Sequence, residues 1–412
     1  MSDPVELFTE IAARHDRCFW LDGGGSRPWS GNRSLLGWLE PDDVSLTYDA
    51  RTRQVHRHAD GRVEVVGDDV FAVLEASLSG DPREHWVGYF GYAARPDLPA
   101  SAADDGMPDA VWMRARHVHE ITHEPSHDAS PPAPLGAPAD AARQVPDDYA
   151  RAFAAVQEEL RAGNSYEVNL THRLATRATA DPVAAYLRLR RLNPAPYAGF
   201  LRHRDAHLLS SSPERFATIR RDRWIETKPI KGTTPRGTTR AADERLRAHL
   251  AADPKLRAEN LMITDLLRND LAMVCVPGTV EVPALMRVES YPGVHQLVTT
   301  VRGRLREEVS TLAALRALFP AGSMTGAPKL RTMEIIDRVE ATPRGAYAGA
   351  FGWISGDGRA DLGVVIRSLT SARPGQWRHG TGGGITVRSD LAEEWAETCW
   401  KTERLRAALE QA

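Results

Sequence analysis

Strand-like and helix-like segments follow one another in blocks along this chain of 412 residues, without strict alternation. Parallel sheets need a crossover between successive strands, usually a helix, so they read as alternating strands and helices. The grouping of strands with strands and of helices with helices favours an α+β fold with large, mostly antiparallel β-sheets packed with helices. The predicted strands are 63–66, 86–92, 166–170, 206–210, 215–219, 348–354, 362–367 and 384–387, and the predicted helices are 147–163, 254–271, 311–318, 328–338 and 391–410.

One break in composition divides the chain. Residues 127–146 are rich in proline and alanine and poor in large apolar side chains, which is typical of a linker or a surface excursion. We therefore expect a β-rich N-terminal subdomain of the same fold over residues 1–126. The candidate functional residues all fall in residues 147–412.

Composition excludes several classes of protein. The 52 basic and 55 acidic residues are well mixed, which argues against a surface for nucleic acid. No apolar run approaches the ~20 residues of a membrane helix, and the first residues lack the pattern of a signal peptide. Cys18, Cys275 and Cys399 form no CxxC pair, which suits a reducing compartment. We expect a cytoplasmic protein that binds neither nucleic acid nor a membrane.

Lys231 lies in the segment Pro229-Ile-Lys-Gly-Thr-Thr-Pro-Arg-Gly237, between a rigid Pro-Ile pair and a Gly-Thr turn. Lysine is rarely buried, because its ammonium group is strongly hydrated. In a pocket the pKa can shift towards the neutral amine, which is a nucleophile. The segment alone is equally compatible with an exposed lysine in a turn.

Glu259 interrupts the apolar face of the helix predicted over residues 254–271. At about 100° per residue, Leu256, Ile263 and Leu267 form one stripe, and Glu259 falls inside it. A carboxylate on an inward face must be paired, protonated or bound to a metal ion. A salt bridge to a neighbouring element and a metal site both remain open.

The predicted C-terminal helix carries a second row of charged residues. Glu394, Glu397 and Lys401 are spaced at i, i+3 and i+7, so they share one side of the helix. One interpretation is an ordinary surface pair of Glu397 and Lys401, which contributes roughly a few tenths of a kcal/mol. The other is an acidic wall facing Glu259, where carboxylates without histidine or cysteine would suit a hard cation such as Mg²⁺.

Three further segments are candidate anion sites. Gly380-Thr-Gly-Gly-Gly384 precedes a predicted strand, where glycines would let backbone N–H groups converge on an anion, or else form a hairpin turn. Residues 319–329 are either an anion-binding loop that enters a helix at Pro328 or a plain capped loop. Arg367 ends a predicted strand, where a guanidinium can clamp a carboxylate. With Lys231 and the acidic cluster, these sites indicate a small substrate with several carboxylates.

Longer motifs of this chain resemble those of the chorismate-utilising enzymes. The resemblance covers about residues 147–410, with the motifs in the order of that family, and is weaker nearer the N-terminus. The matching motifs are Ser212-Pro-Glu-Arg-Phe216, Pro229-Ile-Lys-Gly-Thr233, Ala258-Glu-Asn-Leu-Met-Ile-Thr-Asp-Leu-Leu-Arg-Asn-Asp270, Phe319-Pro-Ala-Gly-Ser-Met-Thr-Gly-Ala-Pro328, Arg344-Gly-Ala-Tyr-Ala-Gly349, Gly382-Gly-Gly-Ile-Thr386 and Glu394-x-x-Glu397-x-x-x-Lys401.

The resemblance implies the fold of that family, with residues 147–412 as the chorismate-binding catalytic region. Anthranilate synthases typically carry alanine where this chain has Lys231, whereas lysine makes the chain similar to the aminodeoxychorismate synthase branch. In that branch the lysine attacks C2 of chorismate as the C4 hydroxyl leaves. Ammonia then adds at C4 and expels the lysine, which gives 4-amino-4-deoxychorismate for p-aminobenzoate and folate synthesis or for a specialised pathway.

The same resemblance carries roles over to individual residues. Lys231 matches the covalent nucleophile and Glu214 the proton donor to the leaving hydroxyl. Glu259 and Glu397 match the Mg²⁺ ligands, with Glu394 beside them acting through water. The positions that match chorismate contacts are Gly232, Thr233, Tyr347, Arg367, Gly382, Gly383, Gly384 and Lys401.

Partners and alternative functions also follow from the sequence. No cysteine lies in a Gly-x-Cys-x-Gly elbow, so we expect ammonia from a separate glutamine amidotransferase subunit or from solution. Two other functions remain open. One is amination at C2, as in the formation of anthranilate or 2-amino-2-deoxyisochorismate, and the other is a non-catalytic subunit that binds chorismate. Lys231 favours C4 over C2, and Glu214 with Lys231 favours an enzyme over a binding subunit.

Overall fold

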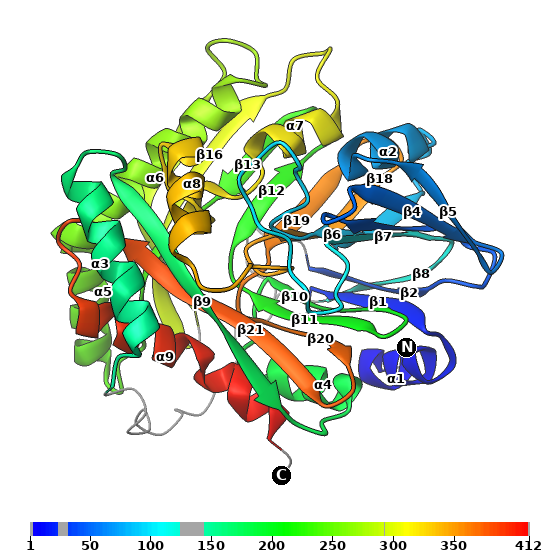
Figure 1. The fold of residues 1–412 in the computed structure, drawn as a ribbon, viewed down its shortest axis with the longest axis horizontal. Helices are drawn as coiled ribbons and strands as arrows, with labels where there is room; N and C mark the ends of the chain where they lie inside the picture. The colour runs from blue at the N-terminus through cyan, green and yellow to red at the C-terminus, as the bar shows by residue number, and fades with distance from the viewer. Residues whose placement is uncertain (1–2, 24–31, 124–143, 292, 411–412) are drawn as a thin grey trace.

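The computed structural model describes residues 3–23, 32–123, 144–291 and 293–410. Within these residues the paired strands are antiparallel and form two large sheets covered by helices (Figure 1), which confirms the α+β prediction. Residues 127–143 of the predicted linker lie outside the described part of the chain.

One sheet has nine strands in the described residues. Their spatial order is β17 (Gly326–Ala327), β9 (Glu167–Arg177), β21 (Gln376–Ile385), β20 (Ser368–Arg373), β11 (Ala206–Ser212), β10 (Tyr197–His203), β1 (Arg17–Asp22), β2 (Arg33–Trp38) and β8 (His117–Thr122).

The other sheet has twelve strands in the same ranges. Their spatial order is β14 (Ile230–Pro235), β16 (Val294–Arg304), β13 (Trp224–Lys228), β12 (Arg215–Ile219), β19 (Ala360–Val364), β18 (Ala350–Ser355), β6 (His85–Phe90), β7 (Ala110–Ala115), β3 (Ser45–Asp49), β4 (Gln54–Ala59) and β5 (Arg62–Gly67), and β15 (Glu281–Ser290) also pairs with β16.

The helices lie on the outer faces and at one end of the two sheets (Figure 1). They are α1 (Pro4–Arg14), α2 (Val70–Ser77), α3 (Asp147–Arg161), α4 (Pro182–Leu192), α5 (Arg240–Ala252), α6 (Pro254–Ala272), α7 (Thr311–Leu318), the 3₁₀ turn η2 (Gly322–Met324), α8 (Lys329–Val339) and α9 (Leu391–Leu409).

The two sheets pack face to face. In β1, Phe19 belongs to a buried cluster that joins both sheets and includes Val87 of β6. The next residue, Trp20, belongs to a different cluster with Phe8 of α1 and Tyr186 of α4. Successive side chains of a strand point to opposite faces, so β1 is buried on both. The nine-stranded sheet therefore lies between the other sheet and a layer of helices.

A third core covers the outer face of the twelve-stranded sheet. It includes Phe71 of α2, Ile263 of α6 and Leu315 of α7, packed with Trp86 of β6 and Phe216 of β12. The layers therefore run helix, sheet, sheet, helix, in which each apolar face is covered by another element.

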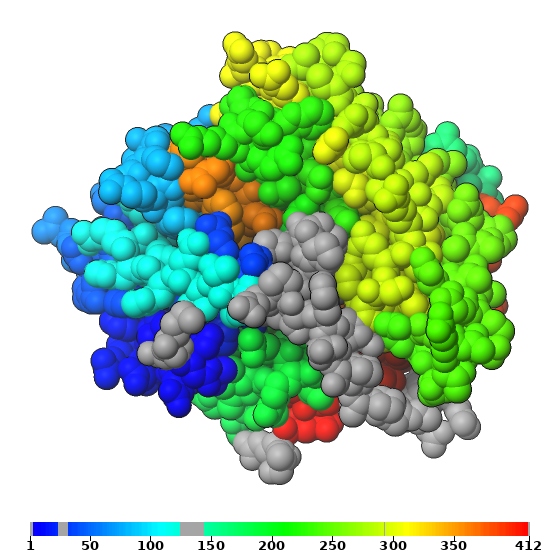
Figure 2. Space-filling view, turned by 180° about the vertical axis from the view of Figure 1, so that it is seen from behind, coloured from blue at the N-terminus to red at the C-terminus, as the bar shows by residue number. Residues whose placement is uncertain are grey.

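Residues from the N-terminal part add strands to both sheets. β1 pairs with β10 in one sheet, and β6 pairs with β18 in the other. Figure 2 shows this from behind, where blue and cyan N-terminal segments adjoin orange segments from around residue 350. The N-terminal and C-terminal parts thus share the same hydrophobic cores.

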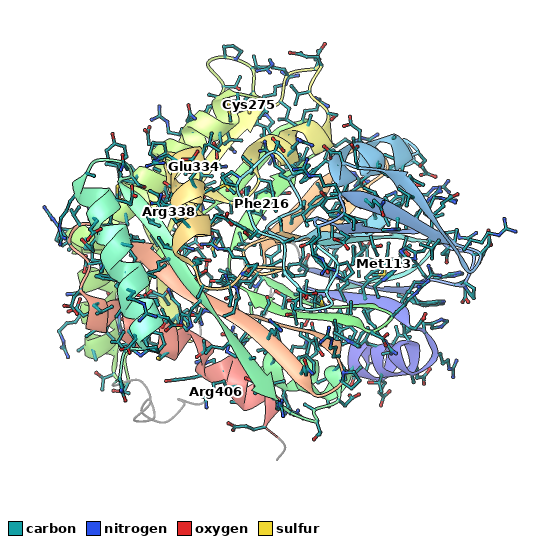
Figure 3. The ribbon with its side chains drawn as sticks, viewed as in Figure 1. Met113, Phe216, Cys275, Glu334, Arg338 and Arg406 are labelled. Atoms are coloured by element: carbon teal, nitrogen blue, oxygen red, sulfur yellow. The ribbon has the colours of Figure 1, made fainter. Side chains whose placement is uncertain are left out.

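The helices are amphipathic. On α8, Ile335 and Ile336 are buried in a cluster with α3 and β9, whereas Glu334 and Arg338, labelled in Figure 3, are exposed. This is the pattern that a helical period of about 3.6 residues produces on the surface of a globular protein. In the described residues we find no helix that combines the length and the apolar character of a membrane span.

Candidate active site

A cavity of about 320 Å³ lies beside β14, α6 and α9, against the strand β21. Every residue that the sequence predicted for the site lines this cavity. These residues are Glu214, Lys231, Gly232, Thr233, Glu259, Tyr347, Arg367, Gly382, Gly383, Gly384, Glu394, Glu397 and Lys401. The structure therefore brings together side chains that are spread over nearly 190 positions of the chain, while their chemical roles remain predictions.

Lys231 reaches the cavity from an irregular part of β14. Ile230 pairs with Val298 and Thr233 with Gln296 of β16, and the register shifts between them. Such a bulge re-aims the side chain beside it, and Gly232, with a φ of 88°, accommodates the turn of the backbone. Lys231 is only 8% exposed, so it is not the exposed turn lysine that the segment alone also allowed.

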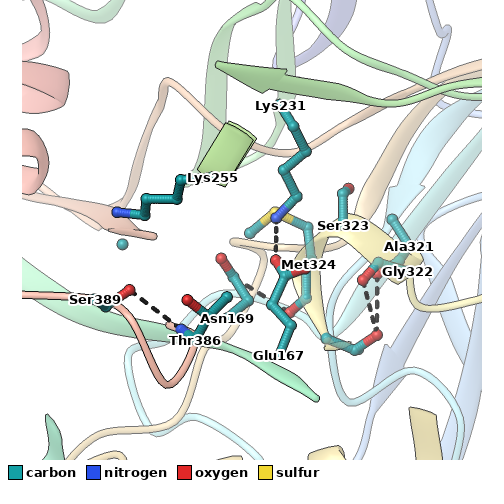
Figure 4. A network of polar contacts seen from close by, with 12 residues as sticks. Glu167, Asn169, Lys231, Lys255, Ala321, Gly322, Ser323, Met324, Thr386 and Ser389 are labelled. Atoms are coloured by element: carbon teal, nitrogen blue, oxygen red, sulfur yellow. Dashed lines mark hydrogen bonds and ion pairs between the residues drawn. The ribbon is translucent and has the colours of Figure 1, made fainter. Parts of the chain in front are cut away.

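The amine of Lys231 donates a hydrogen bond to Oε1 of Glu167 on β9 (Figure 4). Burial opposes the charge of the lysine, but Glu167, Glu259 and Glu214 outweigh it and raise its pKa above the ordinary value. The sequence-based expectation of a shift towards the neutral amine is therefore wrong: the pKa of Lys231 is raised. The reason is the carboxylates around the amine, which favour the charged form.

Glu214 lies in the turn between β11 and β12 and is 5% exposed. Ser323 of η2 donates a hydrogen bond of 2.5 Å to its Oε1. Burial raises the pKa of Glu214 to about 7, against the opposing effects of Ser323, Lys231 and Lys401. A carboxyl group that keeps its proton near neutral pH can act as a general acid.

Glu259 is buried on α6, as its place in the apolar stripe predicted. Asp253 caps this helix by accepting from two backbone N–H groups, with Pro254 at the first position. Burial raises the pKa of Glu259 to about 7, with Lys231 acting in the opposite direction. Its Oε1 is buried and has no hydrogen-bond partner. A salt bridge therefore does not explain this carboxylate.

The two candidate glutamates on α9, Glu394 and Glu397, are each paired with a lysine. Glu394 is buried and accepts from Lys255 Nζ at 2.8 Å. Glu397 is half-exposed and lies 2.6 Å from Lys401 Nζ, and this lysine is the main cause of its lowered pKa. Lys401 also donates to the carbonyl of Gly382 at 2.7 Å. The row of charges thus lines the cavity and is more than a surface pair.

The carboxylates of Glu259, Glu394 and Glu397 line the cavity but do not form a preassembled metal site. Among the described residues, no group of three or more histidine, cysteine, aspartate or glutamate side chains is placed to hold a metal ion. Mg²⁺, however, is commonly bound by one or two carboxylates, with waters and substrate oxygens completing its shell. The unpartnered oxygen of Glu259 and the oxygen-only donor set fit such an ion.

The glycine-rich segment differs from the prediction. Gly380 to Gly384 lie within β21 and pair with β9, from Gly380 opposite Arg173 to Gly384 opposite Asn169, so they form neither an anion-binding turn nor a hairpin. N–H groups of a strand alternate in direction and do not converge. The glycines instead provide space, because a Cβ at Gly384 would overlap Glu167 Oε1 and lie 2.9 Å from Lys231 Nζ.

The other two anion candidates have different outcomes. The first turn of α8 does not line the cavity in the described residues, and Lys329 there is paired with Asp270 at 2.7 Å. The same loop contributes Ser323 and Met324 to the cavity instead. The predicted helix terminus is therefore not an anion site within this cavity.

Arg367 follows β19, which ends at Val364, so the predicted strand is too long by three residues. Its φ is 51°, a left-handed conformation that is uncommon for arginine. The guanidinium lies 5.3 Å from the ring of Trp400, and no described acid forms an ion pair with it. Burial, then Arg404, lowers its pKa to about 10. A cation in a cavity without a protein counter-ion suits an anionic ligand.

Sequence reasoning missed Glu167, Ser323 and Lys255. Glu167 lies in a segment predicted as a strand and is fully buried, which is the same anomaly that identified Glu259 on its helix. Ser323 lies in the loop already singled out, and Lys255 in the first turn of α6. A search for charged residues inside apolar strands would have found Glu167.

Comparisons with known proteins agree with this geometry. A sequence profile described as chorismate binding enzyme matches residues 17–407. The aminodeoxychorismate synthase of Streptomyces pristinaespiralis is 40% identical over 461 aligned positions, which cover 100% of this chain and 64% of that protein. The one from Streptomyces griseus is 38% identical and covers 100% of this chain and 63% of that protein. The chain therefore spans just under two thirds of the length of these relatives.

A solved structure shows the same fold. Anthranilate synthase component I from Streptococcus pneumoniae TIGR4 superposes with a TM-score of 0.76, covers 92% of this chain and 93% of that one, and is 24% identical in sequence. At this identity the likeness concerns the arrangement of the chain and not its chemistry.

Proposed function

The chain belongs to the chorismate binding enzyme family, and we propose that it aminates chorismate at C4 to form 4-amino-4-deoxychorismate. One observation carries this proposal: the buried amine of Lys231 shares a cavity with Glu214, a carboxyl group whose pKa burial raises to about 7, so that part of it carries a proton near neutral pH. A nucleophile and an acid in one cavity suit the displacement of a hydroxyl group. The name aminodeoxychorismate synthase of two relatives that match the whole chain supports the same reaction.

In this proposal two displacements place the nitrogen. Lys231 forms a bond to C2 as Glu214 gives its proton to the departing C4 hydroxyl, which leaves as water. Ammonia then forms a bond to C4 and the C2–nitrogen bond to Lys231 breaks. A single displacement with the same shift of double bonds would leave the amine at C2, so the lysine decides which carbon is aminated.

In this proposal the carboxylates of chorismate bind to positively charged groups of the cavity. Arg367 holds a carboxylate of chorismate, and the contacts to the rest of the molecule come from Gly232, Thr233, Tyr347, Gly382, Gly383, Gly384 and Lys401. Glu259 and Glu397, with Glu394 through water, would hold Mg²⁺. The ion would supply positive charge next to a carboxylate of the substrate.

We propose that a separate glutamine amidotransferase subunit supplies the ammonia. The printed sequence contains no Gly-x-Cys-x-Gly motif, and two of its cysteines, Cys18 and Cys275, are buried with raised pKa values, which makes them poor nucleophiles. A relative from Escherichia coli K12, 43% identical over 64% of this chain, is named aminodeoxychorismate synthase component 1, and a numbered component supports such a partner.

The test combines the protein with chorismate, a magnesium salt and an excess of an ammonium salt at a pH near neutral. We expect 4-amino-4-deoxychorismate, identified by mass and chromatography against a standard. Its absence, with ammonium and also with a competent glutaminase, would overturn the proposal. Fluorescent anthranilate or 2-amino-2-deoxyisochorismate would instead show amination at C2, and binding of chorismate without turnover would show a non-catalytic subunit.

A further inference from the structure

Glu167 has a position that the fold alone does not explain. Along β9, Val168 and Leu170 face a buried apolar cluster, whereas Glu167 and Asn169 point to the other side, where Asn169 lines the cavity. Glu167 is fully buried. A buried carboxylate is costly unless it is paired, and a hydrophobic or amide side chain would serve the sheet at lower cost.

The only described cation bonded to Glu167 is Lys231, which binds Oε1, while Oε2 is buried without a hydrogen-bond partner (Figure 4). Opposite this pair, Gly384 leaves the space that a Cβ would occupy. The bonded oxygen thus fixes the direction of the amine and is placed to take its proton directly, and no described donor binds the second oxygen.

We propose that Glu167 orients the amine of Lys231 and accepts its proton before the amine attacks the substrate. This role rests on the proposed covalent function of Lys231. The direct contact between the two groups makes the transfer local, since no water or third residue has to carry the proton.

The protons balance over one turnover. Lys231 passes a proton to Glu167, the neutral amine forms the bond to C2, and the C4–oxygen bond breaks as Glu214 protonates the leaving oxygen. After the attack the Lys231 nitrogen is a secondary ammonium that carries two hydrogens. Ammonia then adds at C4 as the C2–nitrogen bond breaks, and Lys231 takes the electron pair of that bond and leaves as a neutral amine with both hydrogens. Glu167 returns the stored proton to Lys231, and the new ammonium at C4 returns a proton to Glu214.

The other acids around Lys231 suit this task less well. Glu214 and Glu259 both act on its charge from a distance, and Glu214 is bonded to Ser323 and has the proposed role of donor. Glu259 makes no hydrogen bond to the amine through its buried Oε1. The two other lysines of the cavity, Lys401 and Lys255, are paired with Glu397 and Glu394.

The test compares Glu167→Gln and Glu167→Asp with a matched control, Glu289→Gln. Glu289 forms an ion pair of 2.7 Å with Lys228, a buried lysine three positions from Lys231 that does not line the cavity.

Two quantities are measured in each protein. One is the pH dependence of Lys231 carbamylation by cyanate, read by peptide mass spectrometry, which reports the neutral amine. The other is the rate at which chorismate becomes attached to Lys231 in acid-quenched single turnovers with Mg²⁺ and without ammonia.

In Glu167→Gln we expect carbamylation of Lys231 to reach half its maximum at a lower pH, because one carboxylate no longer favours the ammonium. Attachment of chorismate should nevertheless slow by about tenfold or more, because the proton acceptor is lost. Glu167→Asp should recover part of the rate, and Glu289→Gln should match the wild type in both quantities.

The opposite result is expected if Glu167 acts only as a counter-ion that favours the charged form of Lys231. Chorismate will then become attached to Lys231 in Glu167→Gln as fast as in the wild type or faster, and this outcome overturns the inference. Should Glu167→Gln fail to fold, a wild-type rate in Glu167→Asp overturns it equally. If the wild type attaches no chorismate to Lys231, the covalent route itself is wrong, which is a distinguishable failure of the proposed function.

Discussion

Ser323 donates a hydrogen bond of 2.5 Å to Glu214, and the two residues come from segments more than 100 positions apart. The bond favours the charged form of Glu214, but burial outweighs it and the pKa of Glu214 is about 7. Mutation of Ser323 can therefore separate the effect of this bond on the pKa of Glu214 from the effect of burial.

Glu214→Gln should lower the rate of amination by about 10²–10⁴-fold, the usual contribution of general acid catalysis. In the wild type, kcat/KM should fall as the pH rises through about 7, because Glu214 must carry its proton to act as the donor. A pH–rate profile of both proteins checks this. A variant that retains wild-type rates would remove Glu214 from the mechanism.

Ser323→Ala should move the alkaline limb of that profile to higher pH. The hydroxyl of Ser323 lowers the pKa of Glu214, so its removal leaves burial less opposed and the pKa rises further. The measurement is kcat/KM against pH with ammonium in excess. An unchanged limb, or one that moves to lower pH, contradicts the assignment of this limb to Glu214.

Glu259→Gln should stabilise the metal-free protein at pH 8. The pKa of Glu259 is about 7 in the folded protein and close to 4.5 when unfolded, so the folded state loses stability as the pH rises from 4.5 to 7 and the penalty is complete above it. Removing the charge should raise the free energy of unfolding by about 1–3 kcal/mol. Urea unfolding in the presence of a chelator measures this.

The same variant should lose its response to magnesium. With Mg²⁺ and chorismate added, the wild type should unfold at a higher temperature and Glu259→Gln should not, because a ligand that binds only the folded state stabilises it. An equal shift of Tm in both proteins would show that Glu259 is not a ligand of the ion.

Arg367→Lys should raise KM for chorismate by about 10- to 100-fold, because a charge-assisted hydrogen bond to a carboxylate contributes about 1.5–3 kcal/mol and lysine cannot form it in two-pronged geometry. Arg404→Lys is the control, since Arg404 bonds Asn193 at 3.3 Å and does not line the cavity. Similar KM values for both variants would contradict the role of Arg367.

Gly384→Ala should slow amination more than Gly383→Ala. A Cβ at Gly384 would overlap Glu167 Oε1 and approach Lys231 Nζ, and both groups are buried and cannot move away freely. At Gly383 it would lie 2.9 Å from one oxygen of Glu394 and 4.0 Å from Lys401 Nζ. Steady-state rates of the two variants decide this, and equal losses would show that space beside Lys231 is not limiting.

Local signals predicted α3, α6, α7, α8 and α9, but α1, α2, α4 and α5 were missed. The helix over 254–271 is α6, which begins after Asp253 and at Pro254, and the helix over 391–410 is α9, capped by Asp390. A capping residue acts on the first turn of its own helix, and the apolar residues repeat along that same helix. Both signals are therefore local and can be recognised in a single sequence. The stripe that contains Glu259 is buried as predicted.

Strand partners and electrostatics were harder to predict. Nothing near Gly380–Gly384 indicates that these residues pair with β9, about 210 positions earlier, and a glycine run was therefore assigned to a loop. The pKa of Lys231 depends on Glu167, Glu214 and Glu259, which come from three different elements. The motifs predicted which residues line the cavity. Their pKa values could be predicted only from the fold, because they depend on which charged groups lie next to one another.

The position of the new nitrogen tests the central claim most directly. The protein would be supplied with chorismate, Mg²⁺ and ¹⁵N-ammonium, and the product examined by NMR for coupling between ¹⁵N and the ring carbons. Coupling to C4 in the wild type, and its loss in Lys231→Ala, is the result we predict. Nitrogen on C2, or undiminished C4 amination by Lys231→Ala, would contradict a lysine that directs the nitrogen to C4.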